Sequence, residues 1–580
     1  MAKNIRVNQS HFALLPQANI KRSVFDRSFV YKTTFDEGKL IPYFVDEVLP
    51  GDTFTLNPVE FCRLATPVVP FMDNLYIESF FFFVPSRLVW DNWVKMCGEQ
   101  DNPEDSTDFI VPTVSISSGY NSVGNVIDYM GLGTYLFGAS GSSSSTISIN
   151  CLPFRSYWLI WNEWFRDENL QKSVKVSKGD ANTVVERMGS GSANPNYGFP
   201  DGVSQWYQCA PRGKRHDYFT SCLPWPQKGP AVDLPLGTTA DVVSDGDFSF
   251  TYPAGAAVAM GGGWQSSVPA GTFIPALSFT TTSRSSSGTT FTASNAQTFT
   301  GSGGTTSGQT PSFFPLSYGG GLKVDLQSAT SITINSLRQA FMLQRYYEID
   351  ARGGTRYTEK LQAHFGVTNP DARLQRPEFL GSHSAMMSIN PIAQTSSTND
   401  TSPQGNLAAY GVHGQRYHAF TKSFSEFGYV IGLINVRADL TYQQGIHRMW
   451  TRSDMFDFYW PSFAHLGEQA VLNKEIYAQG TADDDKVFGY QERYAEYRYK
   501  PSLITGQFRS TYKQTLDVWH LSQKFDSLPT LSDQFIQDHP PVSRVVAVPT
   551  YPHFLLDVKF NLKCIRPMPM FGTPGMMGHF

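Results

Sequence analysis

Alternation between apolar and polar positions predicts β-strands in this chain. The clearest case runs from Phe554 to Cys564, where every second residue is apolar and most residues between them are polar. A period of two places one face of a strand in a core and the other in a polar environment. Two further segments, Ile77–Val84 and Tyr429–Val436, are apolar almost throughout. Such runs are typical of strands that are covered on both faces.

Helical periodicity is confined to a few segments. Over Pro153–Asp167 aromatic residues recur at helical spacing, and the proline suits a first turn. The tryptophans of this stripe are candidates for a sugar-stacking platform, although such a stripe more often packs in a core. A second helix is predicted over Ser336–Asp350. Strands joined by long Pro- and Gly-rich connections therefore favour an all-β fold: a single jelly-roll β-sandwich with long loop insertions and a few loop helices.

The stretch Thr251–Leu322 differs from the rest of the chain because its single charged residue is Arg284. Gly, Ser and Thr dominate it, but aromatic residues recur, and a pure linker would lack them. We expect a projecting, strand-rich insertion within 232–322 whose apolar side chains are buried against copies of itself. The candidates for contacts around a symmetry axis are Trp264, Phe273, Phe279, Phe291 and Phe313.

Composition argues against disorder and against a strongly basic nucleic-acid-binding protein. Charged residues make up 17% and aromatic residues 14% of the chain, with 43 Phe and 27 Tyr. Aromatic residues are enriched at the cores of protein interfaces, so the composition suits either a large β-core or surface buried by other protein. The formal net charge is −4. A chain of this charge can neutralise the phosphates of a nucleic acid only through local basic patches or a basic partner.

The two ends of the chain are predicted to be arms. Residues 1–28 carry no acidic residue before Asp26, so this arm either contacts nucleic acid or is solvated. Residues 564–580 are rich in Pro and Met and are expected to extend over a neighbouring subunit. The jelly-roll core is then 29–231 and 323–563. The candidate DNA contacts in the N-terminal arm are Lys3, Arg6, Lys21 and Arg22.

Two further clusters combine cations with aromatic rings. One contains Arg212, Lys214 and Arg215 just before Tyr218, and these three cations join the candidate DNA contacts. The other, Arg493–Lys500, alternates Arg or Lys with Tyr. Single-stranded DNA is bound by such combinations, and Arg–Tyr sets are also hot spots between proteins. The sequence leaves both alternatives open.

Motifs for catalysis are absent from the sequence, so we expect no enzyme. There is no Walker loop, HExxH, GxSxG or dinucleotide fingerprint. The six cysteines are scattered and are expected to be reduced thiols. Asp483, Asp484 and Asp485 are weak candidates for Ca²⁺, with a solvated turn as the alternative. No apolar run has the length of a membrane span, and the N-terminus lacks a signal peptide's apolar stretch.

Long segments of the chain resemble the major capsid proteins of gokushoviruses, the small single-stranded-DNA phages of the Microviridae. The most informative is LRQAFMLQRYYEIDARGGTRYTEKLQAHFGVTNPDARLQRPEFLG (Leu337–Gly381). Others occur in the family's order along nearly the whole chain, and they depart from it at roughly 106–150 and 242–322. These further segments are Tyr31–Pro42, Arg63–Asn74, Phe80–Trp93, Leu152–Gln171, Arg212–Gly229 and Val487–Arg509.

The resemblance implies a structural protein that assembles with itself into a T=1 icosahedral shell around circular single-stranded DNA. It also implies a protrusion of the insertion at the three-fold axes, whose tip is a candidate for host attachment. The expected partners are genomic DNA on the inner surface, a small basic DNA-binding protein, a DNA pilot protein and a host receptor. The expected location is the virion, after synthesis in the bacterial cytoplasm. A receptor- or carbohydrate-binding jelly-roll module is the alternative.

Overall fold

The computed structural model describes residues 21–117, 123–133, 146–187, 197–230, 232, 334–353, 357–366, 375–398, 400 and 403–571, and the backbone of short strands between 242 and 324. Two compact units divide the chain. One is Met1–Gly229 with Tyr347–Phe580, and the other is Pro230–Tyr346. The second unit contains the predicted insertion 232–322 and ends beyond it, at Tyr346.

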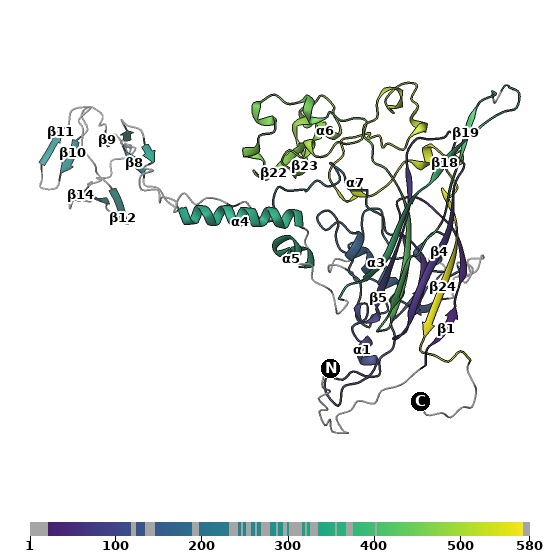
Figure 1. Cartoon of the computed structure of the whole chain (residues 1–580). Helices are drawn as coiled ribbons and strands as arrows, with labels where there is room; N and C mark the ends of the chain where they lie inside the picture. Colours follow the sequence, from purple (N-terminus) through teal and green to yellow (C-terminus); the bar gives the residue numbers. More distant parts are fainter. Residues whose placement is uncertain are drawn as a thin grey trace, which may run out of the picture. The chain divides into compact units, whose positions relative to one another are not determined.

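Two antiparallel sheets pack face to face in the first unit (Figure 1). The seven-stranded sheet consists of β1 (Ser23–Asp26), β2 (Phe29–Phe35), β4 (Thr53–Leu64), β18 (Ser388–Ala393), β19 (Leu407–Arg416), β20 (Phe420–Ser423) and β24 (Phe554–Arg566). The four-stranded sheet consists of β3 (Ile41–Val48), β5 (Leu75–Pro85), β17 (Glu378–Met386) and β21 (Gly428–Ala438).

The order of the strands is that of a jelly roll. The principal strands in chain order are β2, β3, β4, β5, β17, β19, β21 and β24. One sheet joins the first, eighth, third and sixth of these, as β2-β24-β4-β19. The other joins the second, seventh, fourth and fifth, as β3-β21-β5-β17. This alternation between two sheets is the double Greek key of jelly rolls, and the predicted fold class is confirmed.

The core lies between the sheets and follows the predicted periodicity. Along β24 the burial alternates: Phe554, Leu556, Val558 and Phe560 are buried, and the residues between them are exposed or half-buried. Phe560 meets Phe44 of the opposite sheet with ring centroids 5.1 Å apart. Every residue of β21 is buried, as expected for a strand covered on both faces. The predictions for Ile77–Val84 and Tyr429–Val436 hold, because both segments lie within central strands.

Helices sit in the connections between strands. The predicted helix over Pro153–Asp167 is present as α3 (Leu152–Ile160) followed by a π-helical turn, Trp161–Phe165. It packs on β5 and β21. Its indoles are used internally, since Trp158 donates to the Trp206 carbonyl at 2.7 Å and Trp161 to the Pro211 carbonyl at 3.3 Å. The tryptophan stripe is therefore packing.

The remaining helices are α1 (Trp93–Met96), α2 (Val126–Tyr129), α4 (Ile334–Gly353), α5 (Tyr357–Phe365), α6 (Asn473–Ile476) and α7 (Asp533–Ile536). The second predicted helix, Ser336–Asp350, falls inside α4. None of the described helices combines the length and apolar character needed to cross a lipid bilayer.

Two small hairpins belong to the connections: β6 (Thr113–Ile116) with β7 (Ile147–Asn150), and β22 (Glu468–Leu472) with β23 (Val487–Glu492). A second, smaller core lies beneath the latter and unites distant segments, including Tyr218, Val471 and Phe535. The end of the sandwich near this smaller core carries α6, β22 and β23. The opposite end carries β1 and the C-terminal end of β24 (Figure 1).

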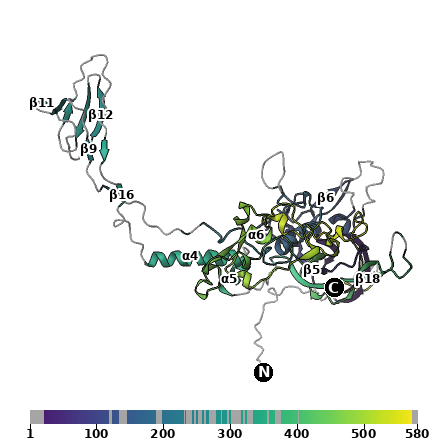
Figure 2. The same cartoon turned by 90° about the horizontal axis from the view of Figure 1, so that it is seen from above.

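The insertion is rich in short antiparallel strands, as predicted; several are visible in Figure 2. These strands are β8 (Val242–Ser244), β9 (Phe248–Phe250), β10 (Ala257–Met260), β11 (Trp264–Ser267), β12 (Phe279–Ser285), β13 (Gly288–Ala293), β14 (Thr298–Thr300), β15 (Leu316–Tyr318) and β16 (Leu322–Val324). They pair as β10-β11, β12-β13-β14, β15-β9 and β16-β8.

The sheet takes residues from both predicted arms. Within 1–28, β1 pairs with β24 from Ser23↔Arg566 to Asp26↔Lys563. At the other end, β24 continues to Arg566 and so includes the first three residues of the predicted arm 564–580. The rest of each arm lies largely outside the described residues.

Candidate assembly and nucleic-acid surfaces

Large apolar side chains lie exposed on the connection between β21 and β24. They lie in and next to three 3₁₀ turns: Arg448–Trp450, Met455–Asp457 and Pro461–Phe463. Trp450 is 74% exposed. The exposed members define what we call the aromatic surface: Met449, Trp450, Met455, Phe456, Phe458, Tyr459, Trp460 and Leu466.

Local polar contacts fix the turns of the aromatic surface. The Asp454 carboxylate accepts from the Met455 amide at 2.6 Å, and the Asp457 carboxylate accepts from the Ser453 amide at 2.8 Å. Pro461 occupies the first turn of its 3₁₀ segment. Successive short turns cannot gather their apolar side chains on one inward stripe, so these remain outside. A patch of this kind on a folded subunit marks a contact with other protein.

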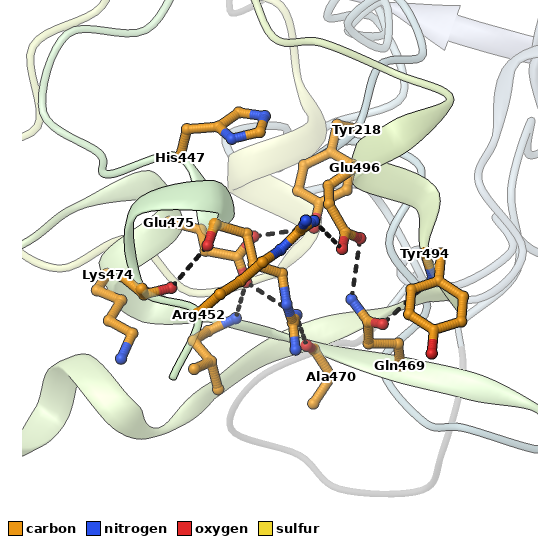
Figure 3. Close-up of polar contacts among 12 residues, drawn as sticks. Tyr218, His447, Arg452, Gln469, Ala470, Lys474, Glu475, Tyr494 and Glu496 are labelled. Carbon is orange, nitrogen blue, oxygen red and sulfur yellow. Dashed lines mark hydrogen bonds and ion pairs between the residues drawn. The ribbon is translucent and has the colours of Figure 1, made fainter. Parts of the chain in front are cut away.

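A buried ion pair between Arg452 and Glu496 lies next to this surface, and Figure 3 shows its polar contacts. The Arg452 guanidinium lies 3.0 Å from the Glu496 carboxylate, and the two side chains are 7% and 2% exposed. Gln469 donates to the other Glu496 oxygen at 3.1 Å and accepts from the Tyr494 amide. The Arg452 guanidinium also lies over two rings, 4.2 Å from the centroid of Tyr497 and 5.3 Å from that of Phe458.

A second carboxylate, Glu475, organises the neighbouring segment. It accepts from the Tyr218 hydroxyl at 2.9 Å and from Arg448 at 3.3 Å. Burial raises the pKa of Glu475 despite these donors. Burial and the nearby Glu475 carboxylate raise the pKa of Tyr218 far above its ordinary value. These polar groups of Figure 3 are engaged with one another, so their arrangement supports the exposed turns.

Comparison with known proteins decides what kind of chain this is. Residues 13–576 match the family described as capsid protein (F protein). The chain belongs to this capsid protein family. Three relatives are each named capsid protein VP1. That of Bdellovibrio phage phiMH2K is 45% identical over 99% of both chains, and that of Chlamydia phage 1 is 45% identical over 98% of both. That of Spiroplasma virus 4 is 35% identical over 99% of this chain and 98% of its own.

The predicted resemblance to gokushovirus capsid proteins is thus confirmed, and the subunit is the major capsid protein of a Microviridae phage. Its relatives are structural proteins, in agreement with the prediction that it is not an enzyme.

The basic candidates of the N-terminal arm are only partly described. Lys3 and Arg6 lie outside the described residues. Lys21 and Arg22 are exposed, and Arg22 hydrogen-bonds to Thr53 of β4. DNA contact by these four residues stays a prediction.

In the capsid subunit Lys214 is buried, whereas Arg212 and Arg215 are half-buried. Burial lowers the pKa of Arg212 to about 9 and that of Lys214 to about 8. Arg215 lies 3.2 Å from Glu78 and 3.4 Å from Asp439. Arg215 is thus engaged in intramolecular ion pairs, and DNA contact by the three residues stays a prediction. The partners of Arg215 are far away in the sequence, so charge alone could not reveal them.

The acidic trio does not converge on one point. It forms the 3₁₀ turn Ala482–Asp485, in which Asp483 pairs with Lys486 at 2.6 Å and Asp485 with Lys474 at 2.7 Å. Asp484 accepts instead from the Gly480 amide at 2.7 Å. Calcium binding there remains an untested prediction, and separate partners favour the solvated turn.

The insertion contacts predicted from aromatic residues also remain untested. Trp264, Phe279 and Phe291 lie on β11, β12 and β13, where only the backbone is described. Phe273 and Phe313 lie outside the described residues.

One cluster of titratable groups could not be predicted from the sequence. Asp36, Glu37 and His553 bring a ligand atom each to within 4.8 Å of the others. The pairing of β2 with β24 brings these three side chains together, because Phe35 of β2 lies opposite Phe554 of β24. His553 is buried, and its Nδ1 lies 2.6 Å from the Glu37 carboxylate across 516 residues of sequence. This hydrogen bond raises the pKa of His553.

The raised pKa of His553 predicts a pH-dependent contribution to stability. The folded state holds the proton more tightly than the unfolded state. The interaction of protonated His553 with Glu37 therefore stabilises the fold fully below the ordinary histidine pKa of about 6.5. This stabilisation is lost as the pH rises through the pKa of His553 in the folded state. We expect His553→Gln to lower the free energy of unfolding by about 1.5 kcal/mol at acidic pH and by less at alkaline pH.

Denaturant unfolding of the purified subunit at several pH values measures this difference. His418→Gln is the matched control, since this exposed histidine contacts Asn57 and not a carboxylate. A loss for His553→Gln that is the same at every pH would contradict the prediction.

Proposed function

We propose that this subunit assembles with copies of itself into a T=1 icosahedral shell that encloses circular single-stranded DNA. The observation that carries the proposal is the aromatic surface. A folded subunit with a complete jelly-roll core leaves this set of large apolar side chains exposed. Self-complementary patches that meet at closed symmetry axes would remove them from water and build a finite particle.

The net charge of the subunit supports a shell in which other basic groups neutralise the genome. The subunit carries a net charge of −4, so enclosed phosphates require basic segments or other polypeptides. We assign this role to the arm 1–28 together with a small basic DNA-binding protein, and we expect a DNA pilot protein in the particle. The insertion 232–322 is our candidate for the three-fold protrusion and for attachment to a host receptor, because loops on a rigid scaffold commonly carry recognition. Synthesis and assembly would take place in the bacterial cytoplasm.

Electron microscopy of the purified protein tests the proposal. Closed shells of uniform size are the expected result. Soluble monomers or trimers with affinity for glycans would favour the alternative, a carbohydrate-binding module.

The role of the aromatic surface has its own test. We expect the triple substitution Trp450→Ser, Met455→Ser and Leu466→Ser to lower particle yield at least tenfold and to leave the fold unchanged, because interface hot spots each contribute about 1 kcal/mol or more. The matched control replaces an aromatic, a methionine and an aliphatic residue that are equally exposed elsewhere: Tyr551→Ser, Met72→Ser and Ile110→Ser. Equal yields from the two triple variants would contradict this role.

A further inference from the structure

A basic ridge adjoins the aromatic surface. Between residues 497 and 516 the sequence contains no Asp or Glu. We define the basic ridge by its exposed rings and cations: Tyr497, Arg498, Tyr499, Lys500, Arg509, Tyr512 and Lys513. Three of these cations, Lys500, Arg509 and Lys513, make no ion pair within the described residues, whereas Arg498 pairs with Glu492.

The two parts of the ridge are anchored to consecutive residues. Tyr442 donates its amide to the Ser502 carbonyl at 3.0 Å and accepts from the Ile504 amide at 2.9 Å. Gln443, which is buried, donates to the Ser510 hydroxyl at 3.1 Å and accepts from the Ser510 amide at 2.7 Å. Residues 502–504, which follow Tyr499 and Lys500, and Ser510, which precedes Tyr512 and Lys513, are therefore tied to one segment of the scaffold.

The ridge differs from the aromatic surface in what it can bind. The aromatic surface is made of Met, Trp, Phe and Leu with a single tyrosine, Tyr459, and it contains no cation, so it suits a dry contact between proteins. The ridge instead presents polar-tipped rings, with Tyr499 and Tyr512 half-exposed, beside lysines, which protein interfaces avoid. Rings that stack on bases beside cations that track phosphates are the pattern of single-strand binding.

We propose that the basic ridge binds single-stranded DNA without sequence preference, with Tyr499 and Tyr512 stacking on bases and Lys500, Arg509 and Lys513 contacting phosphates. The inference rests on the proposed function, because it assigns the enclosed DNA a place on the subunit. It adds one surface to the candidate DNA contacts predicted from the sequence.

Binding of a fluorescently labelled oligothymidylate of about 16 nucleotides to the purified full-length subunit tests the proposal. The charge variant is Lys500→Gln, Arg509→Gln and Lys513→Gln. Each phosphate contact in a single strand contributes about 0.7 to the slope of log K against log salt, so the slope should fall by about 2. The ring variant Tyr499→Ala with Tyr512→Ala should weaken binding about tenfold per ring and leave the slope nearly unchanged.

Matched substitutions control for net charge. Lys172→Gln, Lys178→Gln and Arg187→Gln remove two lysines and one arginine that are exposed elsewhere, and they should have a far smaller effect. Wild-type affinity and slope in the charge variant would overturn the proposal. A variant that binds the oligonucleotide normally but fails to assemble would identify the ridge as a contact between copies, and this outcome would overturn it as well.

The DNA content of assembled particles separates this inference from the proposed function. Wild-type particles without DNA would refute enclosure of the genome. If wild-type particles contain DNA and particles of the charge variant contain as much, held with equal resistance to salt, only the ridge proposal fails.

Discussion

Replacing Arg155 by methionine is expected to lower the free energy of unfolding by on the order of 4 kcal/mol. Arg155 belongs to α3 and is 0% exposed. Its guanidinium lies between 2.7 and 3.1 Å from carbonyl oxygens that no helix or sheet satisfies. These carbonyls belong to Val89, Gly179, Ala181 and Thr183. Methionine fills a similar volume but has no donor, so buried acceptors would be left unpaired.

We expect the loss of stability to lower the yield of particles as well, because α3 packs on the central strands β5 and β21. Denaturant unfolding of the purified subunit and the yield of particles are the two measurements. Arg155→Lys should be intermediate, since a point-like ammonium cannot serve carbonyls on several sides as a planar guanidinium does. Arg63→Met, at an exposed position of β4, is the control. Identical unfolding midpoints for Arg155→Met and wild type would contradict the prediction.

The sequence predicted the sandwich well because its strands carry their own signal. The alternation over Phe554–Cys564 reappears as the burial pattern of β24. The continuous apolar run around Tyr429–Val436 reappears as a strand buried at every position. These patterns depend on which face of an element meets the core, and that is a local property of the chain.

Contacts between distant segments could not be predicted in the same way. The cations Arg212–Arg215 matched the pattern of a DNA site, but the fold places Arg215 against Glu78 and Asp439, which precede and follow it by more than a hundred residues. The aromatic surface lacked a period because 3₁₀ turns expose residues one after another. Composition left open whether the aromatic residues form a large core or surface for contact with other protein, and only the structure shows which of them are exposed.

Replacing Arg452 by methionine is expected to destabilise the subunit by about 3–5 kcal/mol and to impair assembly. The substitution leaves the Glu496 carboxylate buried with Gln469 as its remaining side-chain donor. It also removes the cation that lies over the rings of Tyr497 and Phe458. One change therefore affects both the buried pair and the support of the aromatic surface.

A second substitution separates these two effects. In the double variant Arg452→Met with Glu496→Gln, no charge remains to be desolvated, so most of the stability should return. Particle yield should stay low, because the rings still lack the guanidinium that positions them. Unfolding curves and particle yields of the two single variants, the double variant and wild type complete the cycle. A double variant as unstable as Arg452→Met would show that the unpaired carboxylate is not the cause. Full recovery of both stability and yield would show that the aromatic surface does not depend on the stacked guanidinium.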